Sequence, residues 1–202
     1  KTFFLIDTQF IDLNKGVYYT INEIFKKNYY SFTKLDKISI DINFKDYEKL
    51  KKIRAKSINK NYLHSKEYLN AKLSFNNQTF HADVRLDGLF SDHWSLRKQW
   101  SLKFKIKENK AIKGYTNFTL SNHFTRQHPF NQIISSINAH HGVLSPRSET
   151  FRVKINGEWW GNMLLEEDMS ESFLELNKRK VNPIFRFEDI YTQLSLRKKI
   201  KR

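Results

Sequence analysis

Residues 68–88 read YLNAKLSFNNQTFHADVRLDG, and this stretch decides the fold that the sequence predicts. Apolar and polar residues alternate on both sides of a central Asn-Asn-Gln, which is the pattern of two half-buried strands joined by a polar turn. The apolar side of the pattern consists of Leu69, Ala71, Leu73, Phe75, Phe80, Ala82, Val84 and Leu86. We therefore expect an antiparallel β-hairpin with one face in the core.

The same alternation returns in other parts of the chain. Residues 38–44, ISIDINF, and residues 100–106, WSLKFKI, carry an apolar residue at every second position. Residues 151–167 predict another hairpin, because Asn156-Gly157 is a pair typical of type I′ turns. The apolar side of the second segment consists of Trp100, Leu102, Phe104 and Ile106. These segments are expected to join the hairpin in one sheet.

Residues 128–142, HPFNQIISSINAHHG, form the clearest predicted helix. Pro129 suits the first turn of a helix, and Gly142 suits its C-terminal end. An apolar stripe at helical spacing contains Ile133, Ile134 and Ile137. We expect this stripe to pack on the sheet face that carries Trp100, Leu102 and Phe104, since an amphipathic helix buries its apolar side.

The order of these segments is strands, one long helix and strands again, which predicts an α+β fold. The sheet is expected to be mostly antiparallel, with helices flanking it. We divide the chain into an N-terminal extension (1–36), one α+β domain (37–190) and a basic tail (191–202). Neither an internal repeat nor a Gly/Ser linker interrupts the domain.

Composition favours a folded protein with an anionic partner. The chain has 202 residues, 39% of them hydrophobic, and a net charge of +15 with a pI near 9.8. Such a charge indicates a phosphate, nucleotide, nucleic acid or acidic polymer as ligand, although abundant lysine also follows from an AT-rich gene. Cysteine is absent, which excludes disulfides and thiolate chemistry. No apolar run approaches the ~18 residues of a transmembrane helix.

Several motifs of catalysis are missing. The sequence contains neither GxGxxG nor GxxxxGK[ST], and no GxSxG marks a serine nucleophile. The histidines lack partners at the spacing of metal ligands, so no metal site is predicted. Asp92 and His93, in the loop between two strands, form either an acid–base pair or an ordinary Asx-type turn.

A row of cations is predicted on the polar side of the sheet. Alternation places Arg85, Lys103 and Lys105 opposite the core, where like charges repel unless water or an anion lies between them. We predict that these residues bind phosphate, with Lys98 added from the loop 88–98. In this hypothesis Asp92 and His93 organise the loop. The alternative is an edge strand that lysines protect against aggregation.

Five segments in order resemble the CotH family, which is named for a spore-coat protein and whose members look like atypical secreted protein kinases. The segments are FHADVRLDGLFSDHW, KQWSLKFKIKENKAIKGYTNFTL, the helix after FTRQHPF, RVKINGEWWGNMLLEED and NKRKVNPIFRFED. The family's related patterns are a V-R-L-K-G strand, a loop with D-H, K-W-S-F-R-I-K, V-x-L-N-G-x-x-G-x-Y-x-L-x-E and R-R-E-G-P-I-I-R-F. The resemblance covers residues 38–189.

The resemblance implies the nucleotide-side lobe of a kinase-like fold, with ATP and Mg²⁺ as cofactors. A lysine from 98–105 would then reach the nucleotide phosphates, and Glu166 or Glu167 would lie near a hinge, with Arg126 as a supporting residue. Asn131 stands where relatives often carry Glu, so a Lys–Glu ion pair is not carried over. The family's catalytic aspartates lie further downstream than Arg202, so we expect a chain that is incomplete or degenerate and inactive alone.

The predicted function is therefore the N-terminal part of a CotH-like atypical kinase that transfers phosphate from ATP to a surface protein. The alternative is a non-catalytic basic module that binds an anionic envelope polymer or nucleic acid. An anionic ligand and a protein acceptor are the expected partners of a monomeric chain. The resemblance implies a cell-envelope or extracytoplasmic location, while a cytoplasmic one stays open.

Overall fold

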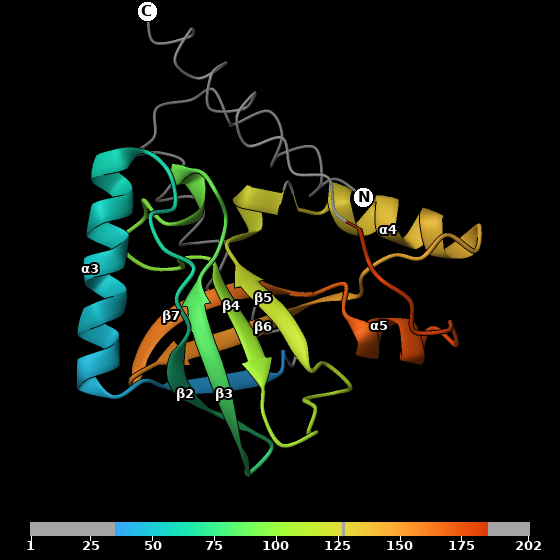
Figure 1. Cartoon of the computed structure of the whole chain (residues 1–202), viewed down its shortest axis with the longest axis horizontal. Coiled ribbons are helices and arrows are strands. Elements are labelled where there is room, and N and C mark those ends of the chain that lie inside the picture. The colour runs from blue at the N-terminus through green and yellow to red at the C-terminus, as the bar shows by residue number, and fades with distance from the viewer. Residues whose placement is uncertain (1–34, 127, 186–202) are drawn as a thin grey trace, which may run out of the picture.

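The computed structural model describes residues 35–126 and 128–185, and its strands form a closed seven-stranded barrel (Figure 1). The strands are β1 (Lys37–Asp41), β2 (Leu69–Phe75), β3 (Gln78–Leu86), β4 (Leu102–Ile106), β5 (Asn117–Ser121), β6 (Ser148–Ile155) and β7 (Glu158–Glu167). The helices are α3 (Phe44–Lys60), α4 (Phe130–His140) and α5 (Glu171–Leu176), with 3₁₀ turns at Ser91–His93 and His123–Arg126. Most of the predicted extension 1–36 and all of the tail 191–202 lie outside the described residues.

Closure of the barrel corrects the predicted fold class. Neighbouring strands follow the order β1-β2-β3-β4-β5-β7-β6, and a parallel pairing of β1 with β6 joins the two ends. The prediction of an α+β fold, with an open sheet between flanking helices as in a kinase lobe, is therefore wrong. Alternation with period 2 is the same in a covered open sheet and in a barrel, because both bury one face of every strand.

The hairpin that decided the prediction is present as expected. Leu69 pairs with Val84 and Phe75 with Gln78, which makes β2 and β3 antiparallel neighbours. Asn76 and Asn77 turn the chain with φ values of 47° and 61°, as a type I′ turn requires. All of the predicted core side chains of β2, β3 and residues 100–106 are buried inside the barrel.

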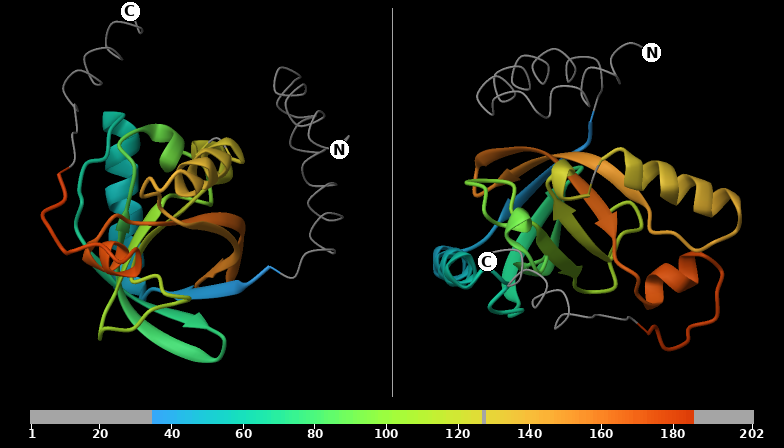
Figure 2. Two further views of the ribbon diagram at one scale, coloured as in Figure 1. Left: turned by 90° about the vertical axis from the view of Figure 1, so that its right-hand side faces the viewer. Right: turned by 90° about the horizontal axis from the view of Figure 1, so that it is seen from above.

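The apolar stripe of α4 is exposed, so its predicted packing is wrong. Ile133, Ile134 and Ile137 are each about half exposed, with Ile134 at 57%. The helix itself forms where the sequence predicted it, but it lies outside the barrel (Figure 2). Because inward side chains from all seven strands fill the interior, no apolar sheet face remains for the stripe.

Helix α3 packs along the outside of the barrel, beside β2 and β3 (Figures 1 and 2). Asn43 caps its first turn by accepting a hydrogen bond from the Asp46 amide at 2.9 Å. Leu50 and Ile53 form its buried side, while its many lysines face solvent. In the part of the chain that the structure describes, no helix has the length and apolar character needed to cross a membrane.

Because Ile134 lies outside the core, we expect Ile134→Ala to change the free energy of unfolding by less than about 0.5 kcal/mol. The matched variant Ile40→Ala removes a side chain that is fully buried in the barrel. We expect it to cost about 2–5 kcal/mol, from lost apolar burial and the cavity that remains. Urea denaturation of both variants measures the difference, and a similar loss for both would place the α4 stripe in a packed interface.

Candidate functional site

The outer face of β3, β4, β5 and β7 carries an aligned row of polar side chains. The strand register sets Arg85 opposite Lys103, Lys103 opposite Thr119, and Thr119 opposite Glu166. Lys105 lies two residues from Lys103 and therefore on the same face. The structure thus brings Arg85, Lys103 and Lys105 together on one surface, which we call the Arg85–Lys103 face.

Carboxylates of the protein neutralise the two central cations of this face. Arg85 pairs with Asp87 at 3.0 Å, and Lys103 pairs with Asp168 at 2.6 Å. Arg85 is only 8% exposed, and the side chain of Lys103 only 15%. Lys105 is exposed and forms no ion pair with any residue in the described ranges. The like charges that were expected to need an external anion are thus largely compensated within the protein.

Further contacts fix the positions of these groups. The Arg85 guanidinium donates to the Leu86 carbonyl at 2.9 Å and lies 5.3 Å from the centre of the Tyr68 ring. From α4, the Asn131 amide donates to the Glu166 carboxylate at 3.3 Å. The first turn of α4 therefore borders the Arg85–Lys103 face through Asn131. This is the position at which the resemblance implied a glutamate.

The loop 88–98 contributes His93 to the edge of this face. The His93 ring is hydrogen-bonded to the Ser101 hydroxyl at 2.8 Å, two residues before Lys103. Gly88 has a φ of 82°, and a Cβ there would lie 2.0 Å from the His93 ring. Asp92 lies 3.9 Å from the same ring. The glycine is thus required both by the backbone conformation and by the space that the imidazole occupies.

Lys98 is not part of the Arg85–Lys103 face. Lys98 pairs with Glu158 at 2.7 Å and donates to the Trp159 carbonyl at 3.1 Å, so it reaches the turn between β6 and β7. The backbone of Arg126 ends a 3₁₀ turn, and its side chain lies outside the described part of the structure. Lys98 lies two residues before Trp100, and in an extended strand this spacing puts both side chains on the same side.

Arg54 of α3 holds the loop 88–98 against the helix. Its guanidinium donates to the carbonyls of Trp94 at 2.7 Å and Leu96 at 2.8 Å, and it covers the Trp100 ring at 4.6 Å. Burial lowers the pKa of Arg54 from its ordinary value.

We expect Arg54→Met to destabilise the protein by about 1–3 kcal/mol, because it leaves partly buried carbonyls without a donor. Lys56→Met on the exposed side of α3 is the control and should change stability by less than about 0.5 kcal/mol. Hydrogen exchange should also quicken at the amides of 91–96 in the Arg54 variant. Unchanged exchange there would show that other contacts hold the loop.

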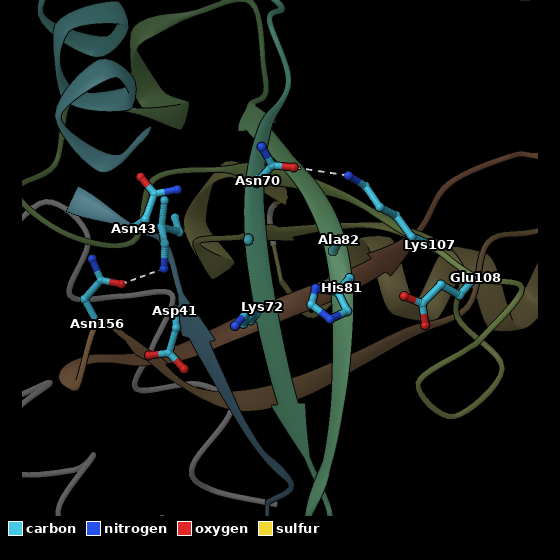
Figure 3. Close-up of a pocket in the computed structure, with 11 residues that line it drawn as sticks. Asp41, Asn43, Asn70, Lys72, His81, Ala82, Lys107, Glu108 and Asn156 are labelled. Carbon is cyan, nitrogen blue, oxygen red and sulfur yellow. Dashed lines mark hydrogen bonds between the residues drawn. The ribbon is translucent and has the colours of Figure 1, made fainter. Parts of the chain in front are cut away.

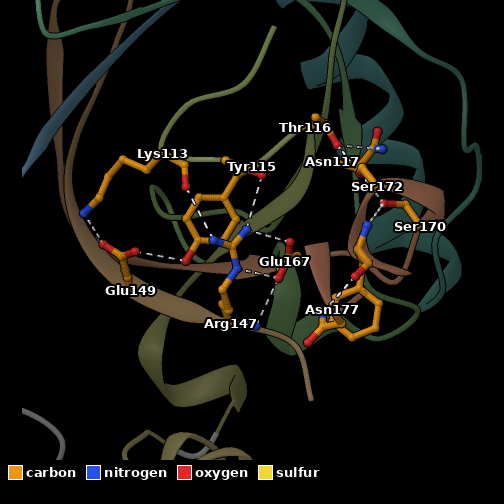
Figure 4. A network of polar contacts seen from close by, with 12 residues as sticks. Lys113, Tyr115, Thr116, Asn117, Arg147, Glu149, Glu167, Ser170, Ser172 and Asn177 are labelled. Atoms are coloured by element: carbon orange, nitrogen blue, oxygen red, sulfur yellow. Dashed lines mark hydrogen bonds and ion pairs between the residues drawn. The ribbon is translucent and has the colours of Figure 1, made fainter. Parts of the chain in front are cut away.

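A second polar cluster lies where β6 begins and β7 ends (Figure 4). Arg147 donates to both carboxylate oxygens of Glu167, at 2.8 and 2.7 Å, and lies 4.3 Å from the centre of the Tyr115 ring. Burial raises the pKa of Tyr115, and the nearby Glu149 adds to the rise. The phenol therefore stays protonated and donates to Glu149 at 3.0 Å. Glu167, predicted to lie near a hinge, is here a buried partner of Arg147.

Arg147→Met should cost about 1–3 kcal/mol of stability, because it leaves the buried Glu167 carboxylate without its bidentate donor. The control is Lys113→Met, which removes a cation of the same cluster whose carboxylate partners, Asp36 and Glu149, are far more exposed than Glu167, and it should cost less than about 1 kcal/mol. Thermal unfolding at neutral pH compares the two. Equal losses would mean that Glu167 finds another donor.

A shallow depression lies on a different part of the barrel surface, over β1, β2 and β3 (Figure 3). Its volume is about 710 Å³, and Lys72, His81 and Asp41 are among the residues that line it. The depression is open to solvent, and its charged side chains are exposed. We assign no chemistry to it. Among residues 35–126 and 128–185, no cluster of three or more His, Asp or Glu side chains has the arrangement of a metal site.

Comparison with known proteins identifies the family. The model of the CotH kinase protein family matches residues 84–200, which is more than half of the chain. The chain belongs to this family, as its motifs predicted. No curated protein matches the chain. The matched region contains all three cations of the Arg85–Lys103 face and both acidic partners, Asp87 and Asp168.

Sequence reasoning missed Asp87 and Asp168 as members of the face. A signal for Asp87 was present, because in VRLDG it lies two residues after Arg85 and shares its side of the strand. Asp168 carried no such signal, since it follows the end of β7 and meets Lys103 across β5. The register of three strands was needed to bring that pair together.

Proposed function

We propose that the Arg85–Lys103 face binds the phosphates of ATP in a CotH-type kinase reaction. One observation carries the proposal: Arg85 and Lys103 lie opposite each other on adjacent strands, are shielded from solvent, and are each held by a carboxylate. Shielded cations interact with phosphate more strongly than exposed ones, because water screens them less. Family membership supports the choice of ATP over other anions.

The chemistry of the face suits a nucleotide with its magnesium ion. Arg85 presents a planar fork of donors that matches two phosphate oxygens, and Lys103 adds a compact positive charge. Mg²⁺ is commonly held by one or two carboxylates together with phosphate oxygens, and Asp87 and Asp168 offer such carboxylates. Bound Mg²⁺ neutralises negative charge on the phosphates during transfer. When ATP binds, Lys103 exchanges its ion pair with Asp168 for a contact with a phosphate oxygen.

The acceptor in this proposal is a protein of the cell or spore surface, and the expected location is the cell envelope. Both rest on what the resemblance to the CotH family implies, and the basic charge is compatible with an acidic acceptor. Phosphate transfer from radiolabelled ATP to an acidic acceptor protein, measured with the natural protein that contains this chain, tests this part. Labelling that depends on Lys103 would support it, and labelling that survives in Lys103→Ala would contradict it.

Calorimetric titration of ATP with and without Mg²⁺ tests the binding face. We expect saturable binding that weakens at least about tenfold in Lys103→Ala and in Arg85→Ala, as loss of a charge-assisted contact predicts. Lys72→Ala, an exposed lysine on β2 outside the face, is the matched control and should bind like the parent. Thermal unfolding of each variant confirms that the barrel is intact.

Asp168→Asn gives a sharper second test. It removes the carboxylate that competes for Lys103, so ATP without Mg²⁺ should bind more tightly than to the parent. Weaker binding would instead make Asp168 a direct contact of the nucleotide. Absence of saturable nucleotide binding, with polyanion binding that falls steeply with salt, would favour the alternative function of a basic module.

A further inference from the structure

The β6–β7 hairpin presents one tryptophan to solvent and buries its neighbour. Trp159 is 41% exposed, whereas Trp160 is 3% exposed and packs against Trp100 with ring centres 5.0 Å apart. A register shift between Val153 and Lys154 accompanies this change of side. Core packing therefore accounts for Trp160 and leaves Trp159 without a structural role of that kind.

Three cations surround the exposed indole, and they come from β6, the neighbour of β7, and from β1 on the other side of β6. The Lys154 ammonium lies 4.8 Å from the centre of the Trp159 ring, and the Arg152 guanidinium 4.9 Å from it. The Lys37 ammonium lies 5.9 Å from the same centre. Lys154 is the cross-strand partner of Trp159, and Lys37 is the partner of Arg152. The arrangement, which we call the Trp159 platform, is thus fixed by the barrel.

Within the described ranges, the charges of the Trp159 platform lack internal compensation. Lys37, Arg152 and Lys154 form no ion pair with a carboxylate in the described ranges, in contrast with Arg85 and Lys103. The nearby Glu158 is paired with Lys98. An aromatic ring and three uncompensated cations therefore face solvent together, and this combination suits a ligand that is both planar and anionic.

We propose that the Trp159 platform binds single-stranded nucleic acid, with a base stacked on Trp159 and phosphates contacting Arg152, Lys154 and Lys37. Aromatic stacking beside a basic surface is the usual design of proteins that bind single strands without sequence preference. Arginine and lysine donate hydrogen bonds but accept none, so these three neighbours match phosphate oxygens better than the hydroxyls of a neutral sugar. The planar indole adds selectivity for bases over a polymer that carries charge alone.

This inference is independent of the proposed ATP face. In the barrel, β2 separates β3 from β1 on one side, and β5 and β7 separate β4 from β6 on the other. Arg85 and Lys103 therefore belong to a different part of the outer surface from Arg152 and Lys154. Either site can fail its test while the other stands.

Fluorescence anisotropy with a labelled oligothymidylate of about 10 nucleotides tests the platform, a length within the usual site size of such proteins. We expect Trp159→Ala to weaken binding about 5- to 100-fold, and Trp159→Phe to restore part of the loss by keeping a ring. In Arg152→Gln/Lys154→Gln the dependence of affinity on salt should become shallower, because fewer phosphates are contacted. Since all three side chains lie on the outer surface, the variants should unfold at the parental temperature.

Controls distinguish base stacking on Trp159 from diffuse electrostatic binding to the basic surface. Lys56→Gln on α3 removes one exposed cation away from the platform and should leave oligothymidylate binding within about twofold of the parent. Polyglutamate and heparin supply charge without bases, and they should compete less well than oligothymidylate at equal charge. Equal competition by either polymer, or parental affinity in Trp159→Ala, would overturn the proposal.

Discussion

The parallel pairing of β1 with β6 is the interaction on which the rest of the structure depends. It joins Lys37–Asp41 to Ser148–Ile155, segments separated by more than half of the chain, and it closes the sheet. A closed sheet has no free edge strands and only one interior, so every inward side chain competes for the same volume. Polar residues and helices are left to the outside, where the two proposed sites lie.

The two outer surfaces differ in how their charge is compensated. On the Arg85–Lys103 face, each central cation has a carboxylate partner and little contact with solvent. On the Trp159 platform, the cations have no such partner among the described residues, and the ring is open. A compensated, shielded pair favours a compact ligand that displaces one partner, whereas an open cluster favours a long flexible polyanion.

Arginine plays a structural part at two places on this barrel. Arg54 satisfies the carbonyls of the loop 88–98, and Arg147 satisfies the buried Glu167 at the end of β7. In both cases the planar guanidinium contacts several acceptors and an aromatic ring at once. The basic composition of the chain thus serves internal order as well as ligand binding.

The sequence by itself determined the strand pairs that are local. The β2–β3 hairpin, the buried side of residues 100–106 and the hairpin at Asn156-Gly157 all follow from alternation and turn residues, which act within a few positions. It also placed Arg85, Lys103 and Lys105 on one face, and its motifs identified the CotH family. The position of α4 along the chain was equally readable from local signals.

Only the tertiary structure decided whether the sheet closes. Closure in turn decided whether the apolar stripe of α4 is buried or exposed. The same alternation fits an open sheet and a barrel, so the exposure of Ile134 could not be foreseen. The Lys103–Asp168 pair and the cluster around Trp159 likewise depend on the register of strands far apart in sequence. Local patterns specify which face of a strand is buried, but long-range pairing specifies which strands become neighbours, and neighbours determine the charge environment of each site.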